Sequence, residues 1–301
     1  MGSAPRHVLE VDDLDPGELL QVLDLSELSA PPPVLAGRGV VLLFEKPSAR
    51  TRASMEMATV QLGGYPVTLR NEEVGIDTRE TAEDLARLFS GYGAVIGARV
   101  FEHHKVERLA AAASVPVVNL LSDDAHPVQT LADLLTIRQA HGRLAGLTVT
   151  YVGDANNVAR SLGIGCGLLG LRFRVSSPPG YGFGAVDLDR LEVAGARPEV
   201  VEDPAAAVAG ADVVYTDAWY SMGQEDEQRE RREAFARWRV DEALMARAAD
   251  GAVFLHCLPA HRGDEATDGV LDGTASRIWP QAHNRMHTAR GLLQFLLDGE
   301  G

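Results

Sequence analysis

Cysteine is scarce in this 301-residue chain, which contains only Cys166 and Cys257. Two cysteines cannot build a disulfide framework, and neither has a second cysteine at the spacing that zinc sites use. We therefore expect two reduced thiols and no metal. Long apolar runs are missing too: none approaches the roughly 20 residues of a membrane span, and the segment 1–13 lacks a secretory hydrophobic stretch. The sequence predicts a cytoplasmic protein with no membrane association.

Positive charge is also in short supply. The chain carries 28 Lys and Arg residues against 43 Asp and Glu residues, a formal net charge of −15. This balance argues against a nucleic-acid-binding surface, because such surfaces are basic. With 46% apolar residues the chain can bury a large core, and its length favours two domains. An anionic substrate would therefore need a local basic pocket.

Short apolar runs alternate with helical patterns along the chain, which is typical of a parallel α/β sheet. A first helix starts after Asp15, with Pro16 at its first position and Glu18 closing a capping box. The predicted strands lie near 40–46, 94–100, 115–121, 148–152, 171–176, 199–202, 212–216 and 252–256. Further helices are predicted near 50–62, 80–92, 103–113, 127–141 and 281–298. The boundary between two α/β domains is expected within the helix 127–141.

Polar and ionisable side chains recur where the predicted strands end. Positions used only for turns would contain mostly Gly, Asn, Asp and Pro. In open α/β sheets, ligands bind beyond the carboxyl ends of the strands. The strand-end residues therefore predict one cleft between the two domains. They are Lys46, the segment 48–52, Arg99, the segments 126–129 and 156–157, Asp217, Ser221, Met222 and the segment 257–262.

The segment 48–52, with the sequence SARTR, is expected at a helix N-terminus, because it follows an apolar run and opens a stretch of helical spacing. The unpaired N–H groups of a helix start, the hydroxyls of Ser48 and Thr51 and the guanidinium of Arg50 suit a tetrahedral dianion. An isolated Ser-x-Arg-Thr is more commonly a capped surface helix. The other strand-end residues favour a phosphate site.

His126 and Gln129 are expected to share one face of the first turn of the helix 127–141. Such a pair can hydrogen-bond a carbonyl or an amide, although a capping or solvent-facing histidine is an equally simple explanation. Gly153 to Asn157 (GDANN) follows a strand and resembles a dinucleotide-binding turn. That signal is weak, because the second and third glycines that admit a pyrophosphate are missing.

Asn156 and Asn157 suit a small polar ligand such as an amino-acid carboxylate. Asp217, followed by Ser221 and Met222, could bind the ammonium of that ligand, although a turn-forming aspartate is equally plausible. Cys257 ends an apolar strand, where a buried structural thiol is the common case.

A functional Cys257 needs a nearby cation or hydrogen-bond donor that tunes the thiol. The neighbouring candidates for that role are His256, His261 and Arg262. The charged segment from Gln224 to Arg237 is expected to be a solvated loop that runs into a short helix, with no catalytic role.

Together these residues resemble the aspartate/ornithine carbamoyltransferase family over nearly the whole chain. The motifs that carry the resemblance lie at 44–46, 48–52, 91–99, 126–133, 153–157, 217–225, 256–263 and 284–285. In aspartate-specific members the Ser-Met-Gly loop and the His-Cys-Leu-Pro tract would be replaced. The resemblance therefore implies transfer of a carbamoyl group from carbamoyl phosphate to the δ-amine of L-ornithine, giving L-citrulline and phosphate.

The resemblance also implies two parallel-sheet α/β domains joined by an interdomain helix. Residues 1–137, with a C-terminal helix of about 284–301 returning to them, would bind carbamoyl phosphate, and residues 138–283 would bind ornithine. A homotrimer or a multiple of trimers is implied, with no dissociable cofactor.

The site residues carried over from the family fall into three groups. Those for carbamoyl phosphate are Ser48, Ala49, Arg50, Thr51, Arg99, His126, Gln129, Cys257, Leu258 and Arg285. Those for ornithine are Asn157, Asp217, Ser221 and Met222. The catalytic residues would be Cys257, Arg285, Arg99 and His126. Asp217 would fix the α-ammonium and Asn157 the α-carboxylate, while Cys257 would position or deprotonate the amine.

Two positions depart from the family pattern. Ala49 replaces the Thr of the usual Ser-Thr-Arg-Thr, so we expect weaker phosphate binding: a lost hydrogen bond costs about 1 kcal/mol, or roughly 1.5–3 kcal/mol with a charged partner. Gly75 stands where many relatives carry a Gln that reaches a neighbouring subunit's phosphate. Three alternatives stay open: a carbamoyltransferase for putrescine or an acylated ornithine, a nicotinamide-dependent dehydrogenase, and a non-catalytic paralogue.

Overall fold

The computed structural model describes residues 5–220 and 227–298. The chain divides into two compact units, Met1–Ala132 with His283–Gly301, and Asp133–Ala282. Each unit is built on a parallel β-sheet with helices, so the predicted fold class of two parallel-sheet α/β domains is confirmed. Within the described residues, every helix is too short or too polar to cross a bilayer.

The sheet of the first unit has four parallel strands in the order β2-β1-β3-β4. Their bounds are β1 Gly39–Phe44, β2 Tyr65–Arg70, β3 Gly93–Arg99 and β4 Val117–Leu121. Every residue of β1 is buried, as expected of a central parallel strand that is covered on both faces. The sequence analysis missed β2, an edge strand that tolerates Pro66 because one side of it needs no ladder hydrogen bond.

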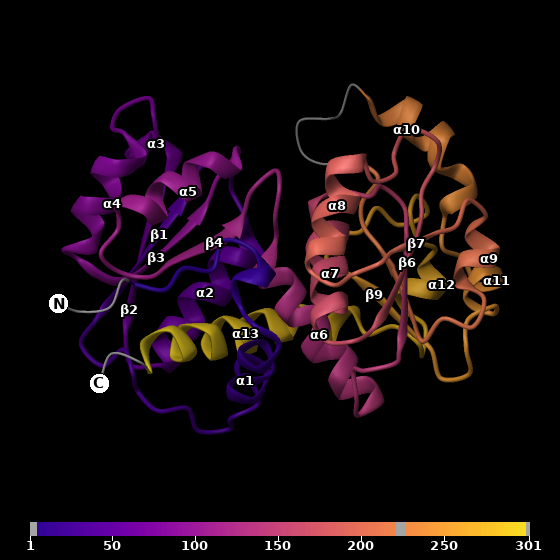
Figure 1. The fold of residues 1–301 in the computed structure, drawn as a ribbon, viewed down its shortest axis with the longest axis horizontal. Helices are drawn as coiled ribbons and strands as arrows, with labels where there is room; N and C mark the ends of the chain where they lie inside the picture. Colours follow the sequence, from indigo (N-terminus) through magenta and orange to yellow (C-terminus); the bar gives the residue numbers. More distant parts are fainter. Residues whose placement is uncertain (1–4, 221–226, 299–301) are drawn as a thin grey trace. The chain divides into compact units, whose positions relative to one another are not determined.

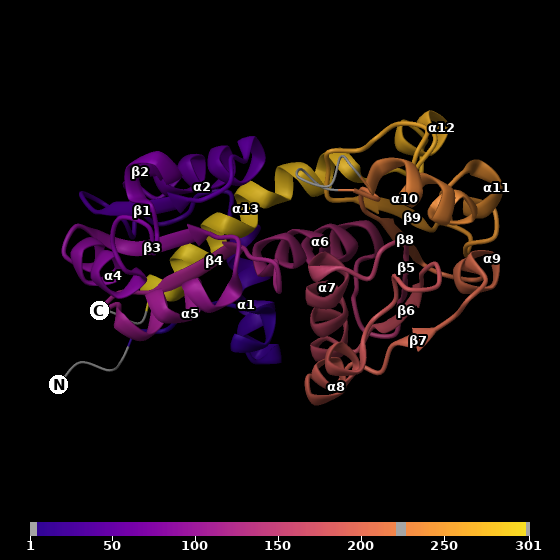
Figure 2. The ribbon, with the colours of Figure 1, turned by 90° about the horizontal axis from the view of Figure 1, so that it is seen from above.

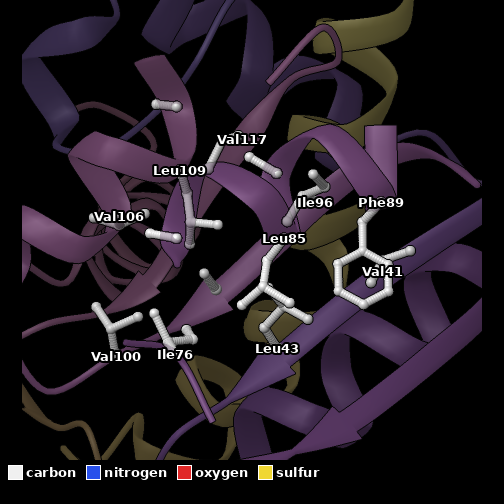
Figure 3. Close-up of a cluster of buried hydrophobic side chains, with 14 of the residues drawn as sticks. Val41, Leu43, Ile76, Leu85, Phe89, Ile96, Val100, Val106, Leu109 and Val117 are labelled. Atoms are coloured by element: carbon white, nitrogen blue, oxygen red, sulfur yellow. The ribbon is translucent and has the colours of Figure 1, made fainter. Parts of the chain in front are cut away.

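Helices cover both faces of this first sheet (Figures 1 and 2). The helices of this unit are α1 Pro16–Ser26, α2 Ala49–Gln61, α3 Asn71–Val74, α4 Ala82–Ser90, α5 His103–Ala112, the start of α6 Pro127–His141 and the second part of α13 Ile278–Leu297. Figure 3 shows α4 and α5 packed on one face, with Leu85 and Leu109 against Val41, Leu43 and Ile96 of the strands. The opposite face is covered by α2 and α13.

The sheet of the second unit has five parallel strands in the order β7-β6-β5-β8-β9. Their bounds are β5 Thr148–Val152, β6 Arg172–Ser176, β7 Glu199–Val200, β8 Val213–Thr216 and β9 Val253–His256. The helices of this unit beyond α6 and the start of α13 are α7 Asn157–Leu168, α8 Ala185–Val193, α9 Pro204–Val208, α10 Gln228–Phe235, α11 Glu242–Met245 and α12 Asp268–Leu271. One hydrophobic cluster packs α11 and α12 against this sheet through Leu244, Val270 and Phe254.

Both sheets change their direction of growth beside their first strand. In the first unit the chain adds β2 on one side of β1 and then returns to the other side for β3 and β4. In the second unit β6 and β7 lie on one side of β5, and β8 and β9 on the other. Loops that leave neighbouring strands at such a switch point diverge and open a crevice. The segments after β1 and β3, and those after β5 and β8, are therefore the expected ligand positions.

Helices α1 and α13 approach closely at Gly291, which leads to a testable effect on stability. A Cβ atom at this position would lie 2.3 Å from Ser26 Oγ and 2.6 Å from the Val22 carbonyl oxygen. We expect Gly291→Ala to lower the free energy of unfolding by about 2 kcal/mol, because α13 must move away from α1. Urea denaturation followed by circular dichroism measures this change.

Gly182→Ala is the matched control, because a Cβ at Gly182 would meet nothing within 4 Å. Its free energy of unfolding should stay within about 0.5 kcal/mol of the parent protein. Equal losses at Gly182 and Gly291 would contradict the close approach of the two helices.

Candidate active site

The segment after β1 begins a helix at the predicted position. Ser48 is the N-cap of α2, and its Oγ accepts a hydrogen bond from the Thr51 N–H at 3.3 Å. The N–H groups of a first helical turn have no carbonyl partner within the helix. A cavity of about 400 Å³ opens beside Ser48 and Ala49, and its charged lining residues are Arg52, Arg70, Glu45 and Glu72. Helix N-termini bind anions through such unpaired N–H groups.

Two guanidinium groups converge on the buried hydroxyl of Thr51. Arg99, the last residue of β3, donates from Nη1 to Thr51 Oγ1 at 3.5 Å, and Arg285 on α13 donates from Nη2 at 3.2 Å. Arg285 Nη1 also donates to Oε1 of Gln129 on α6. Four predicted site residues, far apart in the sequence, are thus brought together in the first unit. Their charges suit a dianionic ligand.

His126 belongs to the same cluster and is buried. Burial lowers the pKa of its imidazole well below the ordinary value, and the positive charges of Arg285, Arg99 and Arg50 lower this pKa further. The imidazole is therefore neutral at pH 7, with one N–H donor and one acceptor nitrogen. A neutral ring among guanidinium groups can hydrogen-bond a ligand without adding charge.

Glu45 ties together the segments that follow β1 and β3, a role that the sequence analysis missed. Its Oε2 accepts the Phe101 N–H at 2.7 Å, and its Oε1 accepts a hydrogen bond from Lys105 Nζ at 2.9 Å. Its own backbone N–H donates to the Arg99 carbonyl at 2.9 Å. The signal in the sequence that could have identified Glu45 is a carboxylate directly after a buried strand and within a basic tract. Glu45 thus fixes the position of Arg99 relative to the start of α2.

Asn156 joins the segments that follow β5 and β8 in the second unit. Its Oδ1 caps α7 by accepting the N–H groups of Val158 at 2.9 Å and Ala159 at 3.2 Å. Its Nδ2 donates to Asp217 Oδ2 at 3.0 Å. The Asn156 side chain therefore occupies the helix start where a dinucleotide would place its pyrophosphate, which argues against the dehydrogenase alternative. Asn157 follows as the first residue of α7 and accepts the Val158 N–H at 3.0 Å.

Cys257 directly follows β9, and its partner is a carboxylate. Its Sγ donates to Asp217 Oδ1 at 2.9 Å. The same oxygen accepts the Ala218 N–H at 2.7 Å. Together with Asn156, these donors hold both oxygens of Asp217 in place. The predicted residues Asp217 and Cys257 are thus brought into direct contact.

The three residues that the sequence analysis offered as tuners of the thiol are engaged elsewhere. Arg262 pairs with Asp268 at 2.6 Å and with Asp272 at 2.7 Å on the surface. The ring of His261 stacks on Tyr220. His256 uses both ring nitrogens in other hydrogen bonds. His256 does lie near the thiol, with a ring nitrogen within 4.8 Å of Sγ, but the direct partner of the thiol is the carboxylate that follows β8, a neighbour in the sheet and not in the sequence.

His256 and Glu265 have fully buried side chains and fix the turn after Cys257. His256 Nδ1 accepts the Leu258 N–H at 2.9 Å, and Nε2 lies 3.1 Å from Glu265 Oε1. Because Nδ1 is an acceptor, the proton is on Nε2 and is donated to the carboxylate. Leu258 has φ of 61°, a left-handed conformation that non-glycine residues rarely adopt.

Potential metal ligands gather at the same turn. The sulfur of Cys257 lies with an imidazole nitrogen of His256 and a carboxylate oxygen of Asp217 within 4.8 Å of one another. Both ring nitrogens of His256 are committed to hydrogen bonds, and the thiol donates to the carboxylate. This donor set is therefore arranged as a hydrogen-bond network and not as a coordination shell.

Two further predictions concern the segment after β8. Ser221 and Met222 lie outside the described residues. The expectation of a solvated segment up to Arg237 is wrong for Arg231 of α10, which is buried. Arg231 Nη1 donates to Asp154 Oδ2 at 2.7 Å and to the Trp219 carbonyl at 2.8 Å. It thereby links the segments after β5 and β8, which no local charge pattern could indicate.

Family models match both units of the chain. The carbamoyl-P binding domain of aspartate/ornithine carbamoyltransferase matches residues 6–139, and the Asp/Orn binding domain matches residues 145–296. Ornithine carbamoyltransferase of Acidothermus cellulolyticus is 50% identical, with 98% of each chain covered. The protein of the same name from Haloquadratum walsbyi is 45% identical, with 96% of this chain and 97% of the relative covered.

Solved structures give the same result. Ornithine carbamoyltransferase from Pyrococcus furiosus has a TM-score of 0.94 and 40% identity, with 99% of each chain covered. A mutant of N-acetyl-L-ornithine transcarbamylase is less similar, with a TM-score of 0.85 and 28% identity over 95% of this chain and 98% of that one.

The buried His126 should make stability depend on pH. Below about pH 6.5 the unfolded chain protonates this imidazole, whereas the folded chain, with its lowered pKa, does not. The unfolded state then binds more protons, so the free energy of unfolding should fall as the pH drops from 7 to 5. His126→Gln cannot titrate and should show a smaller fall in urea denaturation at several pH values. Identical slopes for parent and variant would contradict the neutral, buried imidazole.

Proposed function

Because the chain belongs to the aspartate/ornithine carbamoyltransferase family, we propose that it transfers the carbamoyl group of carbamoyl phosphate to the δ-amine of L-ornithine. The products are L-citrulline and phosphate. The observation that carries this proposal is the Asp217 carboxylate, held by Asn156 and Ala218 and in contact with the Cys257 thiol. A fixed carboxylate beside a thiol suits an acceptor with a free ammonium group.

We propose that the first unit binds carbamoyl phosphate. The helix start at Ser48 and Ala49, with Arg50 and Thr51, would hold the phosphate through backbone N–H groups, hydroxyls and a guanidinium. Ala49 contributes a backbone N–H but no hydroxyl, which supports the expectation of weaker phosphate binding than a threonine would give.

The carbamoyl group would be held by the converging side chains of the first unit. Arg99, Gln129, Arg285 and the neutral His126 form that cluster. Attack on the carbamoyl carbon places negative charge on its oxygen. Guanidinium and imidazole N–H groups that are already oriented stabilise this charge without reorganising, which is how oxyanion sites lower a barrier.

We propose that the second unit binds ornithine. Asp217 would take the α-ammonium, and Asn157 would take the α-carboxylate, because Asn157 carries an amide donor at the start of α7. Ser221 and Met222 would complete this set as the family pattern implies. As the family pattern implies, Cys257 and Arg285 would lie beside the reacting carbon, and Leu258 would contact carbamoyl phosphate.

The amine must be neutral when it attacks. An alkylamine has a pKa of about 10.4 in water and is therefore mostly protonated at neutral pH. Cys257 could deprotonate this amine or only position it. Its hydrogen bond to Asp217 favours positioning, because a thiolate would put two negative charges about one hydrogen-bond length apart. The N–C bond forms first, the C–O bond to phosphate then breaks as the oxyanion collapses, and the proton lost by the amine leaves with the phosphate as hydrogen phosphate.

Carbamoyl transfer to another amine is less compatible with the site. An acylated ornithine has no charged α-nitrogen for Asp217, and putrescine has no α-carboxylate for Asn157. The N-acetyl-L-ornithine transcarbamylase structure is also the less similar relative at 28% identity. A non-catalytic paralogue is the third alternative, and measurable turnover would exclude it.

Citrulline formation from carbamoyl phosphate and ornithine tests the proposed function. We expect turnover with ornithine and at least about a hundredfold lower kcat/KM with putrescine or N-acetylornithine, because each lacks one charged partner.

Asp217→Asn should raise the KM for ornithine roughly tenfold or more while leaving that for carbamoyl phosphate unchanged. Cys257→Ala should lower kcat about tenfold to a hundredfold, since the amine loses its alignment.

Cys166→Ala is the matched control, because this second cysteine is buried in α7 and outside the proposed site. Its kcat and both KM values should stay within about twofold of the parent enzyme. Unchanged kinetics for Asp217→Asn and Cys257→Ala would refute the assigned roles, and the absence of citrulline would refute the function.

We further propose a homotrimer or a multiple of trimers. Apolar side chains are exposed on two neighbouring elements of the first unit, namely Met57 at 49% and Val60 at 53% on α2, and Tyr65 at 52% on the edge strand β2. An exposed apolar patch on an edge strand is typical of a subunit interface. A closed ring of identical subunits would cover such a patch on every copy.

Light scattering after size exclusion tests the assembly. The parent protein should elute at a mass of three times, or a multiple of three times, the 32.3 kDa chain. Val60→Asp should shift the population to smaller species, because it places a charge in the patch. Val186→Asp on α8, where the side chain is 81% exposed, is the control and should leave the mass unchanged. A monomeric parent protein would refute the trimer.

We also propose a cytoplasmic location. Cys166 and Cys257 are both free thiols, which supports a reducing compartment. The proposed mechanism likewise needs Cys257 as a thiol. Fractionation of cells that express the tagged chain measures the location, and recovery outside the cytoplasm would refute it.

A further inference from the structure

Tyr220 and His261 form a contact that the proposed chemistry does not use. Their rings stack with centroids 4.3 Å apart and an angle of 10° between the planes. Tyr220 lies three residues after Asp217, and His261 lies four residues after Cys257. The segment after β8 and the segment after β9 are thus joined at two points, by the Cys257 to Asp217 hydrogen bond and by this stack.

The phenol of Tyr220 adds hydrogen bonds to the stack. Its hydroxyl donates to Asp264 Oδ2 at 2.9 Å and accepts from Gln228 Nε2 at 2.7 Å. Arg232 Nη2 lies 2.8 Å from the same Asp264 oxygen. Burial, and next the hydrogen bond to Asp264, raise the pKa of the Tyr220 phenol, so it keeps the proton that it donates. Helix α10 is in this way tied to both segments.

We propose that Tyr220 and His261 are positioning residues that set the affinity for the amine substrate. By holding the two segments together, they keep Asp217 and Cys257 in the mutual contact that the amine substrate would meet. Neither residue needs to touch the substrate. This inference rests on the proposed function, since it assigns ornithine to these two segments.

The geometry predicts a selective kinetic effect. Without the stack, the two segments keep the Cys257 to Asp217 and Tyr220 to Asp264 hydrogen bonds but lose the ring contact between them, and the ornithine site becomes looser. Ser48, Thr51 and Arg285, which are proposed to bind carbamoyl phosphate, lie in the other unit and do not depend on this contact. A loss of the stack should therefore raise the KM for ornithine and leave the KM for carbamoyl phosphate unchanged.

Four variants of the full-length chain test this clamp. Tyr220→Ala removes the stack and the hydrogen bonds of the phenol and should raise the KM for ornithine about tenfold, whereas His261→Ala removes only the stack and should raise it about threefold. The double variant should be no worse than Tyr220→Ala, since that variant already removes the stack. His261→Phe keeps a flat ring and should stay within about twofold of the parent enzyme.

Tyr92→Ala is the matched control, because it removes an exposed aromatic ring from the first unit. It should leave both KM values within about twofold of the parent. The proposal is overturned if both KM values rise together, if the effects of Tyr220→Ala and His261→Ala multiply, or if His261→Phe is as impaired as His261→Ala.

Hydrogen exchange separates failure of this inference from failure of the proposed function. Amides of the segment 257–261 should exchange faster in Tyr220→Ala and at the parent rate in His261→Phe, whether or not citrulline is formed. If exchange in Tyr220→Ala equals that of the parent, the clamp does not exist. If the parent protein forms no citrulline, the proposed function fails, and the exchange result still decides the clamp.

Discussion

The change in the direction of sheet growth is the constraint on which the candidate site depends. In one unit β2 and β3 flank β1, and in the other β6 and β8 flank β5. Loops that leave such neighbours must diverge, and the helix that starts between them has uncovered N–H groups. Ser48 and Asn156 cap the helices that start at these two points. The polar residues of both units therefore gather at the strand ends for the same topological reason.

The first unit uses its crevice to concentrate positive charge in a chain with a net charge of −15. Arg99 and Arg285 both reach the hydroxyl of Thr51, which leaves two like charges close together. An anion between them would relieve this repulsion, so the arrangement favours a charged ligand over water. His126 adds hydrogen bonding without charge, because its lowered pKa keeps it neutral.

Local patterns in the sequence are enough to predict part of this site, but they do not predict the long-range contacts that complete it. Ser48 as an N-cap and Cys257 at a strand end follow from neighbouring residues, and both were predicted. The carboxylate that contacts Cys257 lies 40 residues away and is adjacent only because β8 pairs with β9. Arg231 can be buried because an ion pair with Asp154, 77 residues away, balances its charge. Strand order and long-range ion pairs of this kind leave no periodicity in the sequence.

The turn after Cys257 shows how a distant carboxylate can set the geometry of a site. The left-handed conformation of Leu258 costs a non-glycine residue about 1–2 kcal/mol. Its N–H bond to His256 Nδ1 offsets roughly 1 kcal/mol of that cost, but only while Nδ1 carries no proton. Glu265 secures this tautomer by accepting the Nε2 proton. The conformation of Leu258, and with it the direction of the Cys257 thiol, therefore depends on Glu265, a side chain fully buried behind the turn.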